Sequence, residues 1–137
     1  MTGATVTDER PVEVGTRLPE LVVATDTTFI VAAALAGRDF EPVHHDADAA
    51  HAAGMDDIFI NILATNGLVV RLVTDWAGPD ARVVRSAIRL GVPQYAGDTL
   101  TLRGEVSAVD GARVEIGVEG SNRLGVHVSG SVTVELP

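Results

Sequence analysis

The chain of 137 residues has no cysteine and no lysine, and it has a single tryptophan and a single tyrosine. Without cysteine, disulfides, thiolate metal sites and cysteine nucleophiles are excluded. All ten basic residues are arginine, which is typical of the coding bias of a GC-rich genome. Nineteen acidic residues outnumber them, so the net charge is −9. This balance argues against a nucleic-acid partner, because binding a phosphate backbone requires clustered positive charge.

Long uninterrupted hydrophobic runs are also absent. The most apolar stretch, 58–77, contains two asparagines, an arginine and an aspartate, whereas a membrane-spanning helix needs about 20 mostly apolar residues. We therefore expect a helix buried in protein and no membrane partner. Residues 1–10 lack the basic and apolar regions of a secretory signal, so we interpret them as a flexible tail preceding one domain at 11–137, and we expect a cytoplasmic location.

Hydrophobic residues make up 46% of the chain, enough to form a core. The spacing of apolar residues changes from helical to alternating after about residue 77. Capping residues support the helix boundaries, with Asp26 or Thr27 before one helix, Gly37 in the C′ position after it, and Gly78-Pro79 ending the longest one. In the first part the pattern predicts a strand at 18–23 and helices at 27–36, 47–53 and 61–77.

The second part reads as an antiparallel meander, with Asp110-Gly111 as a strong hairpin signal between alternating runs. The predicted strands are 82–90, 99–109, 113–119 and 126–136. The long helix is apolar on all sides and must be enclosed, and a curled sheet is the only element large enough to enclose it. The sequence therefore predicts an α+β hot-dog fold, in which an antiparallel sheet wraps around a long central helix.

The loop at 38–46 concentrates acidic residues and histidines around one proline. Its pattern resembles the signature of the MaoC-like hydratase family, an Asp followed by Asn-Pro, an aliphatic residue, His and a further Asp. The residues that match are Asp39, Pro42, Val43, His44 and Asp46, with Glu41 where Asn is usual. The resemblance continues through Ala50, Gly54, Gly97-Asp98-Thr-Leu100 and Glu105-Val106, and it covers most of the chain.

Three further segments narrow the resemblance. They are similar to the small subunits of actinobacterial hydratases that act on steroid side-chain enoyl-CoA thioesters. The three segments are Arg-Asp-Phe with Val-His-His-Asp, residues 57–63 and residues 73–79. This similarity implies an enoyl-CoA hydratase of steroid and cholesterol degradation that works with a larger MaoC-like subunit. Coenzyme A would then be part of the substrate, and no separate cofactor is expected.

The residue types suit that reaction. Adding water across an α,β-unsaturated thioester requires one proton to leave the water and one to reach the α-carbon. A carboxylate and an imidazole can share these roles near neutral pH, and Asp39 and His44 are close enough along a proline-stiffened loop to converge on one water. We therefore assign both as catalytic residues. The structural alternative is that the same two side chains form a salt bridge within the loop or a capping pair.

The start of the long helix supplies the expected oxyanion site. Its first backbone N–H groups lack intrahelical partners and carry the positive end of the helix dipole. Where the family usually has His-Gly-Met, this chain has Asn61-Ile62-Leu63. Asn61 is expected to cap the helix and to form a wall of the site, and the N–H of Ile62 is expected to face the thioester oxygen.

Other residues have plainer interpretations. A metal site of two histidines and one carboxylate is an alternative interpretation of the histidines and acidic residues that follow Val43. Adjacent histidines point in different directions, so we predict no metal. The residues concerned are His44, His45, Asp46, Asp48 and His51. His45, His51 and His127 are expected on the surface, and Trp76 in the core. Gly67 in the middle of the long helix allows either close packing against the sheet or room for a bulky acyl group.

Two other functions remain open on the sequence. One is a non-catalytic hot-dog subunit that supports a partner enzyme, although such a chain would not need Asp39 and His44. The other is a hot-dog thioesterase, which commonly presents a carboxylate from the central helix. In this chain that helix has no acidic residue before Asp75.

Overall fold

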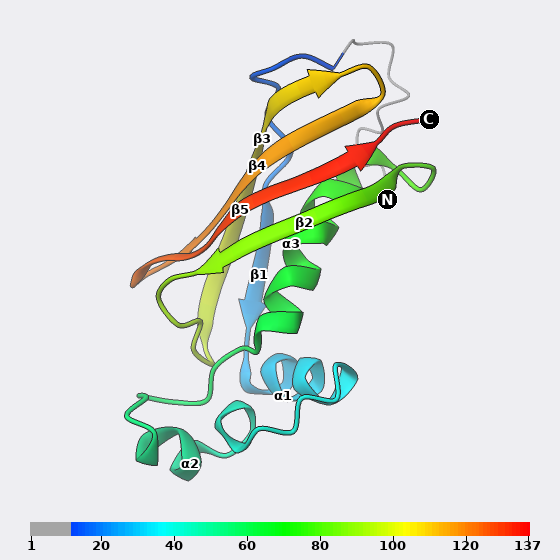
Figure 1. The fold of residues 1–137 in the computed structure, drawn as a ribbon. Helices are drawn as coiled ribbons and strands as arrows, with labels where there is room; N and C mark the ends of the chain where they lie inside the picture. Colours follow the sequence, from blue (N-terminus) through cyan, green and yellow to red (C-terminus); the bar gives the residue numbers. More distant parts are fainter. Residues whose placement is uncertain (1–11) are drawn as a thin grey trace.

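A five-stranded antiparallel sheet forms the main layer of the molecule (Figure 1). The computed structural model describes residues 12–137, so the predicted tail at 1–10 lies outside the described residues. The strands lie in the order β1-β3-β4-β5-β2, which leaves β1 and β2 at the two edges. Their bounds are Leu21–Thr25 (β1), Arg82–Leu90 (β2), Asp98–Asp110 (β3), Arg113–Asn122 (β4) and Gly125–Glu135 (β5).

The alternation in the sequence forms the strands because it gives each one an apolar face. Along β4 the buried side chains Val114, Ile116 and Val118 alternate with outward-facing polar residues. The predicted hairpin is present: Asp110 pairs with Arg113, and Gly111 takes the first turn position with φ 59. These features hold β3, β4 and β5 in the register that buries a single face of the sheet.

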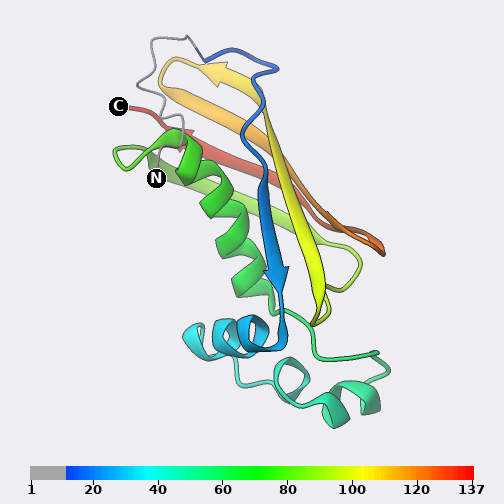
Figure 2. The same cartoon turned by 180° about the vertical axis from the view of Figure 1, so that it is seen from behind.

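Helix α3 (Ile62–Ala77) lies along the apolar face of the sheet, as the two opposite views show (Figures 1 and 2). Its buried residues are Thr65, Leu68, Val69, Leu72, Val73, Trp76 and Ala77. Trp76 is in the core, as predicted. The expectation of a fully enclosed helix is wrong, because the sheet covers only one side of α3. Ile62, Leu63 and Gly67 are exposed on the other side.

Two short helices and a turn lie beyond the N-terminal end of α3. They are α1 (Thr27–Ala36), a 3₁₀ turn (Pro42–His44) and α2 (Ala47–Ala52). The side chain of Asp26 caps α1 by accepting a hydrogen bond of 2.7 Å from the Phe29 N–H. Asp46 caps α2 by accepting hydrogen bonds from the N–H groups of its second and third residues, Asp48 and Ala49. The Asp46 cap therefore fixes the end of the loop that carries the predicted chemistry, and the Asp26 cap fixes the start of the helix that precedes it.

The first strand and the end of α1 differ from the predictions. Strand β1 begins at Leu21 instead of Leu18. Leu18 does bond to the sheet, donating its N–H to the Gly104 carbonyl, but Pro19 has no N–H and interrupts the ladder. At the end of α1, Gly37 is in a right-handed conformation with φ −85, and the left-handed residue is Arg38 with φ 54. The chain therefore reverses one residue later than predicted.

Candidate active site

Asp39 and His44 are brought together by the reversal after α1. The N–H of Asp39 donates a hydrogen bond of 2.9 Å to the Ala34 carbonyl, which ties the carboxylate to the end of the helix. His44 ends the 3₁₀ turn that Pro42 begins. Its Nε2 atom lies 3.5 Å from Oδ2 of Asp39. The five-residue spacing thus places the two predicted catalytic groups side by side, as expected from the sequence.

The imidazole of His44 has a defined orientation. Its Nδ1 atom lies 2.7 Å from the Phe59 carbonyl oxygen. A carbonyl only accepts hydrogen bonds, so Nδ1 carries the proton, and in the neutral ring Nε2 presents its lone pair. That lone pair faces Asp39, another acceptor, so a proton donor that lies beside the pair, within hydrogen-bond distance of each atom, would satisfy both groups. The arrangement suits a water molecule that donates to one or both of these atoms.

The two groups differ in their access to solvent. The His44 side chain is 10% exposed and the Asp39 side chain is 26% exposed. The ring of Phe59 meets the His44 ring edge to face and covers one side of it. Phe59 is a site residue that the sequence reasoning missed, because its contribution is a backbone carbonyl and carries no side-chain signal.

The first turn of α3 offers free backbone donors. Asn61 has the backbone conformation of an N-cap residue, but its side chain forms no capping hydrogen bond, contrary to the expected side-chain cap. Ile62 is the first residue of α3, and the first N–H groups of a helix have no intrahelical acceptor. The Ile62 side chain is 52% exposed, so its bulk is directed away from the core. The predicted oxyanion donor is thus available in this structure.

The amide of Asn61 is buried without a protein partner. The residue is only 1% exposed, and neither Nδ2 nor Oδ1 forms a hydrogen bond within residues 12–137. Its Nδ2 lies next to Gly37, 3.6 Å from where a Cβ on that glycine would stand. Burying an unpaired amide costs free energy. Asn61 was expected both to cap the helix and to form a wall of the site; the side-chain cap is absent, and the wall stays a prediction.

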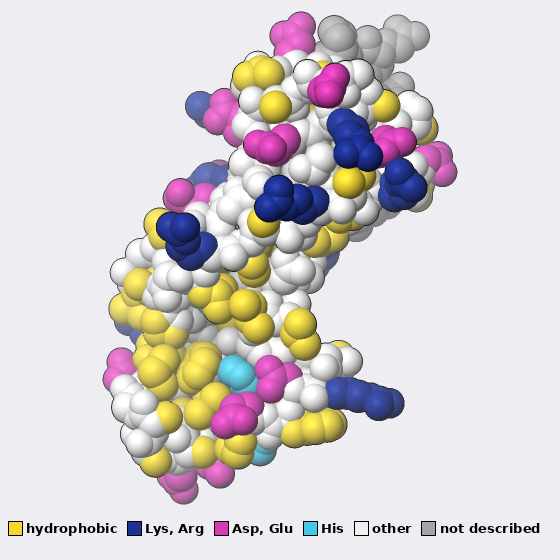
Figure 3. All heavy atoms as spheres, in the orientation of Figure 1, with side chains coloured by type: hydrophobic (Ala, Val, Ile, Leu, Met, Phe, Trp, Pro, Cys, Tyr) yellow, Lys and Arg dark blue, Asp and Glu magenta, His cyan; other side chains and the backbone are white. Residues whose placement is uncertain are grey.

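An apolar groove of about 350 Å³ runs between α1 and α3. It is lined by Phe29, Ala33, Ala36, Gly37, Leu63, Ala64, Gly67 and Leu68. A Cβ added to Gly67 would meet nothing within 4 Å, so this glycine opens space and does not serve close packing. Figure 3 shows hydrophobic side chains gathered beside histidine and acidic side chains in this half of the molecule.

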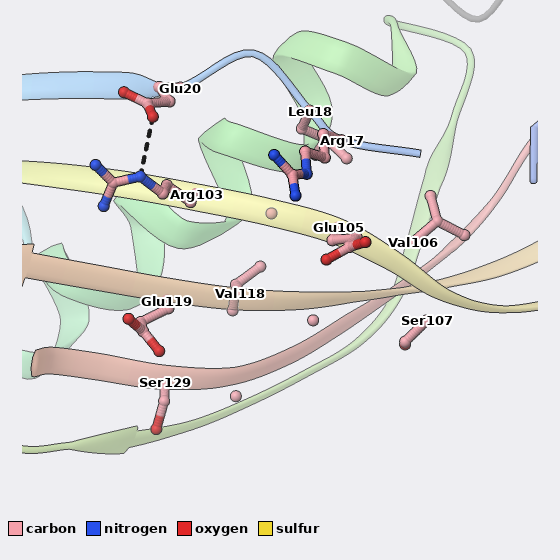
Figure 4. Close-up of a pocket in the computed structure, with 13 residues that line it drawn as sticks. Arg17, Leu18, Glu20, Arg103, Glu105, Val106, Ser107, Val118, Glu119 and Ser129 are labelled. Carbon is pink, nitrogen blue, oxygen red and sulfur yellow. Dashed lines mark hydrogen bonds and ion pairs between the residues drawn. The ribbon is translucent and has the colours of Figure 1, made fainter. Parts of the chain in front are cut away.

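A larger hollow of about 800 Å³ lies on the other face of the sheet (Figure 4). Glu105 and Glu119 line it, and the ion pair between Arg103 and Glu20, with Nε and Oε1 2.9 Å apart, lies along it. These side chains alternate with residues that face α3, so they point away from the helix. None of the predicted catalytic residues lines this hollow. We therefore locate the site by its chemistry at Asp39 and His44 and not by the size of the cavity.

The other histidines separate into two groups. His45 and His51 are exposed as expected, and each ring contacts a backbone carbonyl. The prediction that His127 lies on the surface is wrong, because the residue is only 3% exposed.

Within residues 12–137 no group of three or more His, Asp or Glu side chains is arranged to hold a metal ion. The described part of the chain also has no helix long and apolar enough to span a membrane.

Comparisons with known proteins agree with this geometry. A family model described as MaoC like domain matches residues 8–127. The chain belongs to the MaoC-like family. This MaoC-like chain is 54% identical over 123 residues to a Mycobacterium tuberculosis protein named 3-oxo-4,17-pregnadiene-20-carboxyl-CoA hydratase beta subunit. The match covers 90% of this chain and 95% of that protein.

Solved structures place the fold in the same group. A chain in the crystal structure of the ChsH1-ChsH2 complex from Mycobacterium tuberculosis superposes on the MaoC-like chain with a TM-score of 0.90 and 53% sequence identity, covering 91% of this chain and 98% of that chain. The (R)-hydratase from A. caviae involved in PHA biosynthesis superposes with a TM-score of 0.85 at 22% identity, covering 92% and 98%. The second match concerns the fold alone. The predicted hot-dog architecture is confirmed.

Proposed function

We propose that this MaoC-like chain is the catalytic small subunit of a heteromeric enoyl-CoA hydratase that acts on a steroid side-chain thioester. The observation that carries the proposal is the pairing of Asp39 with an oriented His44 beside a free helix N-terminus. The identity of 54% to a subunit named for hydration of a pregnadiene carboxyl-CoA supports the reaction and the substrate class.

The reaction follows from the positions of the two side chains. A water that lies beside both His44 Nε2 and Asp39 Oδ2 gives a proton to Nε2 as its oxygen bonds to the β-carbon of the enoyl group. A proton is delivered to the α-carbon, so the hydroxyl and hydrogen of one water are added across the double bond. Both groups can hold or release a proton near neutral pH, as general acid–base catalysis requires. The Phe59 carbonyl keeps the imidazole in the tautomer that accepts the proton at Nε2.

The backbone N–H of Ile62 stabilises the negative charge that develops on the thioester oxygen. A donor fixed in a helix terminus does not reorganise during the reaction, and such donors contribute a large part of catalysis in acyl-transfer and related enzymes. Asn61 lines the same end of α3, where its buried amide is available to a polar group of the substrate or to a water. This assignment gives both residues a role in holding the thioester end of the substrate.

The groove between α1 and α3 accommodates the acyl group. Its lining is apolar, and Gly67 leaves the helix surface bare where any side chain would narrow the space. A fused-ring hydrocarbon is rigid and apolar, so it gains by burial in such a groove without losing much conformational freedom. The groove alone is short for a steroid, and a second subunit would complete it.

The surface around the site is suited to a larger MaoC-like partner. Phe40, which follows Asp39 in the chain, is 63% exposed, and Leu63, which lines the groove, is 58% exposed. Strand β2 is an edge of the sheet with one side unpaired, and open edges favour association. Such a partner would supply much of the coenzyme A surface. Coenzyme A enters as part of the substrate, so we propose no resident cofactor, and a cytoplasmic location where acyl-CoA thioesters occur.

The test is to express the chain alone and together with the larger MaoC-like subunit from the same organism. Size-exclusion chromatography measures assembly. Hydration of 3-oxo-4,17-pregnadiene-20-carboxyl-CoA is measured by loss of the absorbance of the α,β-unsaturated thioester, because the 3-oxo-4-ene group in the ring is not hydrated and keeps its absorbance. We expect a stable hetero-oligomer that hydrates the thioester, and much weaker turnover by the chain alone. The Asp39→Asn complex should assemble normally and lose activity. A fully active homodimer that gains nothing from a partner would contradict the heteromeric assembly.

A further inference from the structure

His127 is buried because of an irregularity in β5. Gly120 pairs with Val128, whereas the next residue of β4, Ser121, pairs with Val126. His127 is therefore the extra residue of a β-bulge. A bulge breaks the strict alternation of side chains and can direct one inward, and bulges are frequent next to active sites. Here the bulge turns the imidazole toward the first turns of α3.

Both ring nitrogens of His127 are bonded. Nδ1 lies 2.7 Å from the Val92 carbonyl oxygen, and Nε2 lies 2.9 Å from Oγ1 of Thr65, which is itself fully buried. Because a carbonyl can only accept, Nδ1 carries the proton and Nε2 accepts a hydrogen bond from the Thr65 hydroxyl. The three groups form one directed chain of hydrogen bonds, from the helix through the ring to the loop after β2. A flipped ring would lose both bonds.

The sheet side of this chain is held firmly. The N–H of Gly91 donates to the His127 carbonyl at 2.7 Å, and the N–H of Val92 donates to the Val126 carbonyl at 2.9 Å. The two segments approach so closely that a Cβ at Gly91 would overlap the Val126 carbonyl oxygen, so only glycine fits there. His127 is therefore a fixed point against which the helix can be placed.

On the helix side, the bond reaches the turn that carries the free donors. The N–H of Thr65 donates to the Asn61 carbonyl at 3.1 Å and so closes the first turn, which includes Ile62. Threonine is a weak helix former, and valine would fill the same volume without a hydroxyl to satisfy. A buried hydroxyl–imidazole pair specifies one position of the helix, whereas apolar contacts allow it to slide.

We propose that Thr65 and His127 are positioning residues of the hydration reaction: their hydrogen bond fixes the first turn of α3 so that the Ile62 N–H meets the thioester oxygen. This inference rests on the function proposed above and extends it to two residues outside the catalytic loop. Neither residue contacts the substrate in this role. Their effect on turnover passes through the position of the helix terminus.

The first experiment replaces Thr65 by valine in the complex with the larger subunit, using 3-oxo-4,17-pregnadiene-20-carboxyl-CoA. We expect kcat to fall about tenfold to a hundredfold, as for a small displacement of a catalytic group, with KM changed less than about twofold because ground-state binding uses other contacts. Thr65→Ser keeps the hydroxyl and should restore most of kcat. Native kcat in Thr65→Val, or no recovery in Thr65→Ser, would overturn the proposal.

A second variant separates positioning from stability. Thr65→Val leaves His127 Nε2 unpaired and should lower the midpoint of thermal unfolding. The double variant Thr65→Val/His127→Leu removes both polar groups, so much of the midpoint should return. Under the proposal its kcat remains low, because no directed bond sets the helix. A double variant with native kcat would mean that the pair acts only on stability.

Ser86→Ala is the matched control. It removes the 2.7 Å hydrogen bond from Ser86 to Asn66, which also joins α3 to the sheet but one residue farther along the helix. Its kcat should stay close to that of the wild type, and a loss equal to that of Thr65→Val would contradict a specific role for the pair. Asp39→Asn is measured in parallel. If that variant keeps its activity the proposed function fails, whereas loss of activity there with native kcat in Thr65→Val defeats only this inference.

Discussion

The imidazole of His44 is held by Phe59 through two different contacts. Its Nδ1 donates to the Phe59 carbonyl at 2.7 Å, and the two rings meet edge to face with their centroids 5.0 Å apart. The hydrogen bond fixes the tautomer, and the ring contact limits rotation. One residue therefore determines which nitrogen of His44 faces Asp39, and it lies only two positions before Asn61, the N-cap of the helix proposed to stabilise the oxyanion.

Replacing His44 by alanine should lower hydration turnover by about a hundredfold or more, because the general acid–base group is lost. His45→Ala is the matched control, since it removes the adjacent and exposed histidine, and it should keep near-native turnover. Steady-state kinetics of the complex, with circular dichroism to verify folding, measure the effect. If the two variants behaved alike, the assignment of His44 would be wrong.

Proline at position 62 should remove the oxyanion donor and leave the helix intact. The first helical position tolerates proline, and Asn61 already has the extended conformation, φ −82 and ψ 157, that a residue before proline prefers. We expect the activation barrier to rise by about 2–4 kcal/mol. Ile62→Ala keeps the N–H and should retain turnover. Unchanged kinetics in a well-folded Ile62→Pro protein would place the oxyanion donor elsewhere.

The stability of the chain should fall with acid in a way that depends on His127. Burial lowers the pKa of this histidine below its usual value of 6.5, and the hydrogen bond to Val92 offsets this in part. The unfolded chain then binds more protons than the folded chain between the lowered pKa and 6.5. The contribution of His127 to the free energy of unfolding is therefore complete above pH 6.5 and is lost as the pH falls through the lowered pKa.

Urea denaturation at about pH 7.5 and about pH 5.5 measures this difference in the free energy of unfolding. The Thr65→Val/His127→Leu variant keeps the other titratable groups, so it should show a smaller difference between the two conditions. An equal difference in both proteins would mean that His127 does not contribute to the acid sensitivity.

Filling the groove at Gly67 should change which thioesters are hydrated, without affecting the catalytic step itself. Gly67→Leu places a side chain in open space between α1 and α3, so turnover of the steroid thioester should fall while turnover of a short enoyl-CoA is maintained. Gly67→Ala is the smaller control, and it should raise the free energy of unfolding by up to about 1 kcal/mol through helix propensity. Equal losses on both thioesters would argue against this groove as the acyl site.

Local signals in the sequence were enough for most of the fold. Three of these signals predict a helix start, a helix end and a hairpin, and the structure has all three. They are Asp26 before an apolar run, Gly78-Pro79 after one, and Asp110-Gly111 between alternating runs. The pairing of Asp39 with His44 was also predictable, because a short stiffened loop limits how far apart they can lie. These features depend on residues that are neighbours in the chain.

The errors concern contacts between distant segments. Strict alternation along β5 places Val126 and Val128 inward and His127 outward, but the bulge opposite β4 reverses this for His127. Similarly, the composition of α3 predicts burial without indicating that the sheet covers only one side of it. The uncapped side chain of Asn61 depends on the packing of α1, which no local pattern encodes.

The order of the strands has a consequence for how the chain is synthesised. Strand β1 pairs with β3, with Leu21 opposite Leu102, and within residues 12–137 β2 pairs only with β5, with two strands between them along the chain. Helix α3 is therefore complete before most of the surface that buries it exists. Because such long-range pairings must wait for loop closure, the nascent chain presents an uncovered apolar helix until β3, β4 and β5 have emerged from the ribosome and paired.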